Sequence, residues 1–222
     1  MRKRGPKAKQ NLLLKWSSNF AYAIGLIVSD GCLSKDGRHI DLTSKDLEMI
    51  VNFQKALNTN YLIGRKSGGK TREKEYFMVQ FSNVRFYNFL CSIGIMPAKS
   101  KTITEVDVPD KYFFDFLRGL FDGDGTIYSY WDPRWKSSFM YYVSFVSASE
   151  AFVAWLRFTI ERLSGVFGHV KEDGGGSTLQ LTYAKRESLI LLKKMYRHPR
   201  ALSLSRKRLK SKKILGIVGE RL

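Results

Sequence analysis

The chain has few cysteines and no long apolar run. Its two cysteines, Cys32 and Cys91, are far apart and match neither a disulfide framework nor a zinc site. We therefore expect two buried free thiols in a reducing intracellular compartment, whether cytoplasm, nucleoid or organelle matrix. The apolar run 20–28 falls well short of the roughly 20 residues of a membrane-spanning helix. No contact with a membrane is predicted.

Acidic residues are also scarce, with 20 Asp and Glu against 38 Lys and Arg, which gives a net charge of +18. This excess is larger than solubility requires, so it favours a polyanionic partner such as a nucleic acid. The chain is 44% hydrophobic and 14% aromatic, which is enough to build a sizeable core.

An internal repeat organises the sequence. Aligning Asp30 with Asp124 also aligns Phe20 with Phe114, Gly25 with Gly119, Leu26 with Leu120 and Gly31 with Gly125. The repeat predicts three parts: a basic N-terminal arm (1–17), an N-terminal half (18–108) and a C-terminal half with a basic tail (109–222).

Each copy has the pattern α-β-β-α-β-β-α. After an opening helix that ends in Asp-Gly, the expected segments are strands within 32–43 and 126–146, helices 46–58 and 149–163, strands 61–66, 75–82, 166–172 and 178–183, and helices 83–93 and 185–196. This order predicts an α+β fold of two pseudo-symmetric halves. Helices would cover one face of each antiparallel sheet and leave the other face open as a saddle.

The two opening helices carry a stripe of small residues. Ala21, Gly25 and Ser29 lie on one helix, and Gly119 and Gly123 lie on the other. Such stripes let two helix backbones approach closely. We therefore expect the two helices to pack against each other.

The ends of these helices resemble a known motif. The segments AIGLIVSDG (23–31) and LRGLFDGDG (117–125) are similar to the two nine-residue motifs of LAGLIDADG homing endonucleases. Val28 replaces the first acidic residue of the motif, and Arg118 stands at a usually small or apolar position. Two copies in one chain match the monomeric two-motif branch, so the resemblance implies a monomer whose motif helices form the interface between halves.

The resemblance implies that Asp30 and Asp124 bind divalent metal at the scissile phosphates, with the carbonyls of Gly31 and Gly125 as further ligands. Two carboxylates about 5 Å apart repel by roughly 3 kcal/mol at an effective dielectric near 20, so the pair requires a cation or a shared proton. Oxygen ligands favour Mg²⁺, and Mn²⁺ or Ca²⁺ can take the same sites. Two such ions can activate water and stabilise the leaving oxygen of a phosphodiester.

The family also implies a basic residue after the last helix of each copy, which indicates Lys99 and Lys207. For Lys207 a simple phosphate contact is an equally good interpretation. Ser44, Lys45 and Ser147 stand where the family places polar groups that organise solvent. Because Ala148 takes the place of Lys45 in the second copy, the two cleavage sites are expected to differ.

DNA contacts are expected from outward-facing strand residues. The candidates are Ser34, Arg38, either Ile40 or Asp41, Lys66, Tyr76, Gln80, Tyr128, Tyr130, Tyr142, His169, Lys171, Gln180 and Thr182. Basic segments at 2–9, 66–74 and 206–213 are interpreted as phosphate-binding loops or arms, or as solvated tails.

The predicted function is sequence-specific cleavage of double-stranded DNA at a long site, roughly 20 bp or two helical turns, which can be asymmetric or pseudo-palindromic. The resemblance implies short 3′ overhangs and a role in intron or intein mobility. Two alternatives remain open on the same fold. One is an RNA-binding maturase that assists intron splicing, and the other is a non-cleaving DNA-binding protein.

Overall fold

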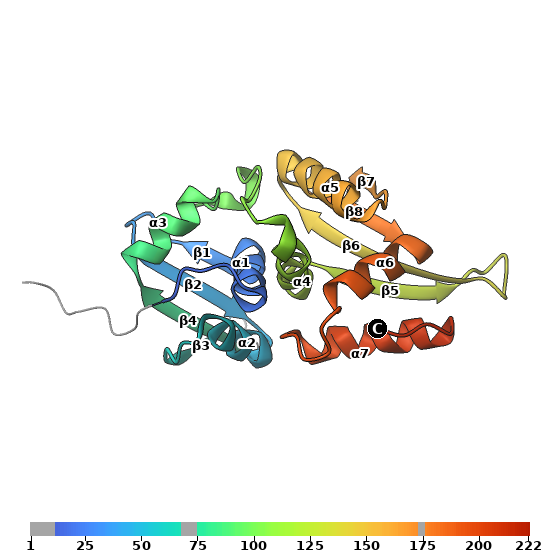
Figure 1. The fold of residues 1–222 in the computed structure, drawn as a ribbon, viewed down its shortest axis with the longest axis horizontal. Coiled ribbons are helices and arrows are strands. Elements are labelled where there is room, and N and C mark those ends of the chain that lie inside the picture. Colours follow the sequence, from blue (N-terminus) through green and yellow to red (C-terminus); the bar gives the residue numbers. More distant parts are fainter. Residues whose placement is uncertain (1–11, 68–74, 173–175) are drawn as a thin grey trace, which may run out of the picture.

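Two four-stranded antiparallel sheets flank a central pair of helices in the computed structural model (Figure 1). The structure describes residues 12–67, 75–172 and 176–222. The predicted basic segment 2–9 lies outside these ranges, as does most of the predicted loop 66–74.

The two halves repeat the same order of elements. The first contains α1 (Ser18–Asp30), β1 (Gly31–Leu33), β2 (His39–Ser44), α2 (Leu47–Leu57), β3 (Ile63–Ser67), β4 (Glu75–Ser82) and α3 (Val84–Ser92). The second contains α4 (Phe113–Gly123), β5 (Thr126–Trp131), β6 (Phe139–Ser147), α5 (Glu150–Ser164), β7 (His169–Glu172), β8 (Leu179–Ala184) and α6 (Lys185–Met195). The strand orders β1-β2-β4-β3 and β5-β6-β8-β7 correspond. The predicted fold class is confirmed.

One face of each sheet is buried and the other is open. Along β2 and β4 the buried residues alternate with outward ones, so that Ile40, Leu42 and Val79 enter the core. Val143 and Leu181 do the same in the second sheet. Helices α2, α3, α5 and α6 pack on the buried faces, which leaves the opposite faces free (Figure 1).

The central helices α1 and α4 pack backbone against backbone. A Cβ atom at Gly25 would lie 2.2 Å from the carbonyl oxygen of Phe116, and one at Gly119 would lie 2.1 Å from that of Tyr22. No side chain fits at either crossing point, so both positions require glycine. The predicted close packing of the two motif helices is confirmed.

The basic segment 206–213 is part of a packed helix, so its interpretation as a solvated tail was wrong, while its contact with phosphate stays a prediction. It belongs to α7 (Ser205–Ile217), which buries Lys207, Ser211, Ile214 and Leu215. These residues follow the i, i+4, i+7, i+8 spacing of one helix face. The many lysines and arginines around them hid that pattern.

The cysteines are free, as predicted, but neither is buried. Cys32 is exposed and Cys91 is only partly buried. Gly31 and Leu33 on either side of Cys32 are buried, so strand alternation turns its side chain outward. Within the described ranges, none of the helices is long and apolar enough to cross a membrane.

Candidate active site at the crossing of the central helices

The two motif aspartates meet where α1 and α4 end. Asp30 is the last residue of α1, and Asp124 is the C-cap of α4. A Cβ atom at Gly123 would lie 2.4 Å from Oδ2 of Asp30, so the end of α4 lies directly against this carboxylate. The glycine of the second motif therefore brings the acidic end of one half against that of the other.

Both carboxyl groups are held where a negative charge is unfavourable. Burial raises the pKa of Asp30, and its Oδ2 atom is buried without a hydrogen-bond partner. Asp124 is exposed as a whole residue, but protein atoms crowd its carboxyl group. Burial, together with the charge of Asp30, raises the pKa of Asp124 to about 6. A bound cation would relieve both effects.

Lys99 and Lys207 occupy equivalent positions beside the aspartates. Lys99, in the 3-10 helix η1 (Lys99–Lys101), is buried and donates to the carbonyl oxygen of Gly31. Lys207, in α7, donates to the carbonyl oxygen of Gly125 at 2.6 Å. Burial lowers the pKa of both amines, and that of Lys207 falls to about 8.

Each lysine acts electrostatically on both aspartates, and more strongly on the aspartate of the opposite half. Lys207 lowers the pKa of Asp30 more than Lys99 does, whereas Lys99 has the larger effect on Asp124. A cavity of about 240 Å³ is lined by Lys99, Asp124 and Ser147. The two candidate sites are therefore composite, because each combines an aspartate from one half with a lysine from the other.

The two serines lie at matching places and hold backbone. Ser44 Oγ accepts a hydrogen bond from the Asp46 N–H at 3.1 Å, and Ser147 Oγ accepts one from the Ser149 N–H at 3.1 Å. Both bonds fix the residue that precedes α2 or α5. Lys45 is exposed and lies over the Tyr76 ring, 5.6 Å from its centroid. The catalytic roles of Ser44, Lys45 and Ser147 stay predictions.

Asp122, which was not assigned a role from the sequence, is fully buried beneath the site. It accepts hydrogen bonds from the Tyr22 hydroxyl at 2.8 Å and from the Leu204 N–H at 2.7 Å. Burial raises its pKa to about 6. One signal in the sequence could have pointed to Asp122, because it is the first acidic residue of the second motif. Val28 stands at the corresponding position of the first motif.

The Arg118 guanidinium lies over the Tyr22 ring of α1, 5.4 Å from its centroid, and so contacts the facing helix without entering the contact between Gly25 and Gly119. It is buried, pairs with Asp115 at 2.8 Å and donates to the carbonyl oxygens of Met195 and Leu202. This departure from the motif therefore leaves the α1–α4 crossing intact. Its guanidinium instead anchors the segment that leads from α6 to α7.

The donor set fits a hard divalent cation. Asp30 supplies a buried oxygen without a partner, and Asp124 supplies a second carboxylate. Within the part of the chain that the structure describes, no group of three or more His, Cys, Asp or Glu side chains could hold a metal. The protein would thus provide few ligands, and water or phosphate oxygens would complete the shell, as is usual for Mg²⁺. The carbonyls of Gly31 and Gly125 already accept lysine bonds, but each has a second lone pair.

Most candidate DNA contacts lie on the open sheet faces. Strand alternation and pairing place Lys66, Tyr76, Gln80, Tyr128, Tyr130, Tyr142, His169, Lys171, Gln180 and Thr182 on the faces opposite the helices. Ser34 and Arg38 were expected on strands but lie in the β1–β2 connection, because β1 ends at Leu33. The rings of Tyr128 and Tyr142 stack at 5.0 Å. Whether these residues contact DNA stays a prediction.

The open face continues into the candidate active site. Asp41 on β2 was one of two adjacent outward candidates in the sequence, and the register pairs it with Gln80. Burial raises its pKa, while the charges of Lys66 and Lys99 lower it. Lys99 therefore lies within electrostatic reach of both the sheet surface and the two aspartates.

The fold is shared with known proteins, although no family model and no curated protein sequence matches the chain. The homing endonuclease I-WcaI bound to its DNA recognition sequence is 13% identical, with a TM-score of 0.62 over 94% of this chain and 95% of that one. I-DmoI in complex with DNA and Ca is 15% identical, with a TM-score of 0.57 over 87% and 97%. Full-length DUF199/WhiA from Thermotoga maritima is 17% identical, with a TM-score of 0.56, and the match covers 82% of this chain but 57% of WhiA. The present chain therefore has the LAGLIDADG fold, with both halves in a single polypeptide.

Proposed function

We propose that this protein is a monomeric, divalent-metal-dependent endonuclease that hydrolyses both strands of a long double-stranded DNA site. The observation that carries the proposal is the pair of composite sites at the α1–α4 crossing. Each site combines one aspartate with one buried lysine from the opposite half. Without a bound cation, the negative charge of that aspartate is poorly compensated by the protein.

The residues have distinct tasks in this reaction. Asp30 and Asp124 would hold Mg²⁺ or a similar ion, which supplies Lewis-acid activation of water and phosphate. Lys99 and Lys207 place positive charge beside the carboxylates, where it can stabilise the charge that develops on the phosphate. Ser44 and Ser147 hold the backbone that frames each site.

The open sheet faces supply the DNA-binding surface in this proposal. Two sheets side by side suit a site of roughly 20 bp, or two helical turns, with one half-site for each sheet. The structures of I-WcaI and I-DmoI, which share the fold, contain DNA. The halves differ in sequence, so the two half-sites need not match.

The fold alone does not decide between cleavage and binding, because homing endonucleases and WhiA share it. A non-cleaving DNA-binding protein is thus the second candidate, and an RNA-binding maturase is the third. Asp30 and Asp124 at one crossing favour cleavage, because binding alone does not require two adjacent carboxylates in a chain of charge +18.

A selection from a randomised duplex library, with and without Mg²⁺, tests the proposal. Sequencing of the cut ends should reveal one long site with short 3′ overhangs in the presence of Mg²⁺ only. Tight binding without any cut would favour the non-cleaving candidate. Preferential binding of structured RNA would favour the maturase.

Substitution of the aspartates gives the matching test at single residues. Asp30→Asn and Asp124→Asn should each reduce cleavage by at least about 100-fold, because each removes a charged ligand of the metal. Affinity for the selected DNA, measured in Ca²⁺, should change little. Asp110→Asn removes an exposed carboxylate that pairs with Arg162 and serves as the control. Full activity in either motif variant would overturn the assignment.

A further inference from the structure

The start of α7 is held by the N-terminal half, although α7 belongs to the C-terminal half. We infer that Asp46 and Glu48 at the start of α2, here called the α2 clamp, position Lys207 for the site at Asp30. This inference rests on the proposed function. It predicts that cleavage of one DNA strand depends on the contacts of the α2 clamp, whereas cleavage of the other strand does not.

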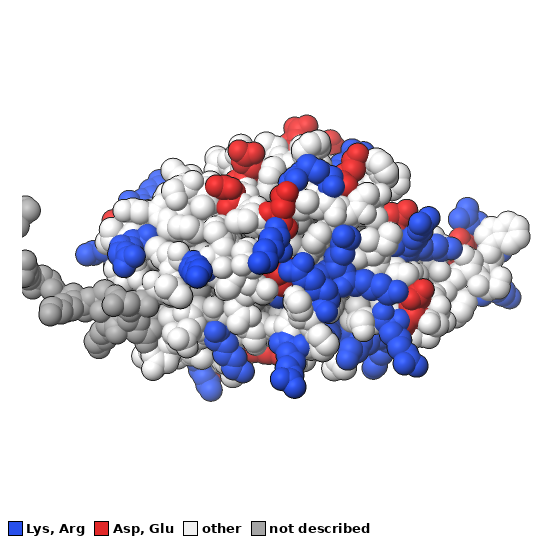
Figure 2. Space-filling model, in the orientation of Figure 1, with Lys and Arg blue, Asp and Glu red and all other residues white. Residues whose placement is uncertain are grey.

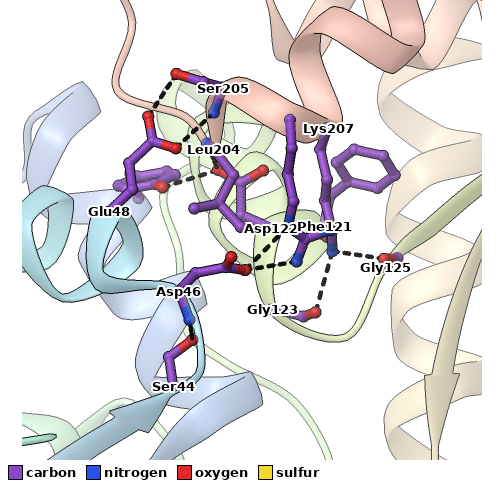
Figure 3. Close-up of polar contacts among 12 residues, drawn as sticks. Ser44, Asp46, Glu48, Phe121, Asp122, Gly123, Gly125, Leu204, Ser205 and Lys207 are labelled. Carbon is purple, nitrogen blue, oxygen red and sulfur yellow. Dashed lines mark hydrogen bonds and ion pairs between the residues drawn. The ribbon is translucent and has the colours of Figure 1, made fainter. Parts of the chain in front are cut away.

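Glu48 caps α7 across the interface between halves. Its carboxylate accepts a hydrogen bond from the Ser205 N–H at 3.0 Å and another from the Ser205 hydroxyl at 2.5 Å (Figure 3). Leu204, the N-cap residue of α7, has no side chain able to accept a hydrogen bond. Glu48 therefore satisfies an N-terminal amide that α7 cannot cap itself, and it lies at the positive end of the helix dipole.

Asp46 holds the next residue of the helix. Its Oδ2 accepts hydrogen bonds from Arg206 Nη2 at 2.6 Å and from Arg206 Nε at 3.0 Å. Asp46 is fixed in turn through its own N–H by Ser44 (Figure 3). Because Lys207 directly follows Arg206, the clamp fixes the turn of α7 that carries the lysine.

The lysine itself is held by the C-terminal half. Its Nζ donates to the carbonyl oxygens of Phe121 at 2.5 Å, Gly123 at 3.1 Å and Gly125 at 2.6 Å (Figure 3). All three acceptors belong to the C-terminal half, whereas the two residues before Lys207 are bound by the N-terminal half. The clamp acts through this backbone and does not touch the reacting atoms.

Lys99 has an equivalent support with different chemistry. Ser149, the N-cap residue of α5, donates from its hydroxyl to the carbonyl oxygen of Ile103, and the Ile103 N–H donates to the Lys99 carbonyl oxygen at 2.9 Å. Ser149 is buried, whereas Asp46 and Glu48 are partly exposed. One lysine is thus positioned by a buried neutral bond and the other by solvent-accessible ionic contacts.

Strand-specific cleavage tests the clamp. Each strand of the selected DNA site is end-labelled separately, and single-turnover rates are measured for Glu48→Ala. One cut should slow by about 10- to 100-fold because the lysine is displaced from its working position. The other cut should stay within about twofold, and nicked DNA should accumulate. Glu48→Gln, which keeps one acceptor oxygen, should recover part of the loss.

Two further variants distinguish a loss of Lys207 positioning from general damage to the protein. Arg162→Ala breaks an exposed ion pair of similar length, 2.6 Å to Asp110, and should slow neither cut. Lys99→Met should slow the cut that Glu48→Ala spares. Equal slowing of both cuts by Glu48→Ala, or no slowing of either, would overturn the inference.

A measurement independent of cleavage separates this inference from the proposed function. The acylation rate of Lys207 by acetic anhydride, followed by peptide mass spectrometry, should rise in Glu48→Ala while that of Lys99 stays constant. A wild-type protein that cuts no DNA would refute the nuclease proposal alone. Unchanged labelling of Lys207 in the variant would refute the clamp.

Discussion

At the scale of single residues, the protein keeps an acidic group in a place where folding disfavours its charge. The pKa of Asp124 rises to about 6 in the folded state, from an ordinary value near 4, through burial and the charge of Asp30. The folded protein therefore binds this proton more tightly than the unfolded chain does. Between pH of about 4 and 6, this residue makes the metal-free protein less stable as the pH rises.

Asp124→Asn should consequently stabilise the metal-free protein at pH 7, by about 1 kcal/mol once solvent screening at this exposed residue is allowed for. The gain should vanish below pH of about 4, where the wild-type carboxyl group is protonated in both states. Urea unfolding in a chelator, at both pH values, measures the difference.

Asp110→Asn should have the opposite effect on the stability of the folded state. Its hydrogen bonds to Arg162 lower the pKa of Asp110, so its charge stabilises the folded state above the unfolded pKa and this contribution is lost as the pH falls. The substitution should lower stability at pH 7. A stability loss at pH 7 in Asp124→Asn would contradict the assigned cause of the raised pKa.

At the scale of elements, the α1–α4 crossing joins the halves and forms the candidate active site. The backbones touch at Gly25 and Gly119, so any added atom must separate the two helices. Separation would also move Asp30 away from Asp124. Stability and the geometry of the site therefore depend on the same contact.

Gly25→Ala should destabilise the protein by about 3 kcal/mol, since the new Cβ would lie 2.2 Å from the backbone oxygen of Phe116 and 2.7 Å from the backbone nitrogen of Leu120. Gly216→Ala in α7 is the matched control, because nothing apart from its chain neighbours and the backbone of its own helix lies within 4 Å of the added Cβ. That variant should gain about 0.5–1 kcal/mol from helix propensity. Thermal and urea unfolding report both changes. Equal stability of Gly25→Ala and wild type would show that the helices can part without cost.

At the scale of the whole molecule, the positive charge is not confined to the open sheet faces. Lys and Arg side chains also gather near α6 and α7 on the face shown in Figure 2. Part of this surface is a pocket of about 670 Å³ lined by Lys193, Arg197, Arg208, Lys212 and Arg221, among other residues. The molecule thus carries a basic surface on α6 and α7 in addition to the open sheet faces, on which Lys66 and Lys171 lie.

Salt dependence should distinguish the two surfaces. The logarithm of the DNA association constant should fall linearly with the logarithm of the salt concentration, and each lost phosphate contact should reduce the slope by about 1. Lys171→Ala, on the open face of β7, should show that reduction. Lys212→Ala, on α7, should leave the slope unchanged. The reverse result would place the DNA on the helical side.

The sequence alone determined the parts of this protein that depend on local pattern. The duplicated motif, the alternation along β4 and the order of elements follow from residue spacing, and spacing within one element survives whatever packs around it. Asp30 and Asp124 could be paired because the repeat placed them at equivalent helix ends. The α7 helix was missed because its buried stripe includes Lys207 and Ser211, whose burial depends on partners elsewhere in the chain.

Only the tertiary structure decided which aspartate each lysine affects more strongly and what holds the lysine in place. Lys207 and Glu48 are far apart in the sequence, and their connection through Ser205 exists only once the halves dock. The same holds for Ser149 and Ile103 near Lys99. Hydrogen bonds between halves depend on the position and angle of the α1–α4 crossing. Local patterns carry no information about these quantities, because the crossing forms by contact between distant glycines.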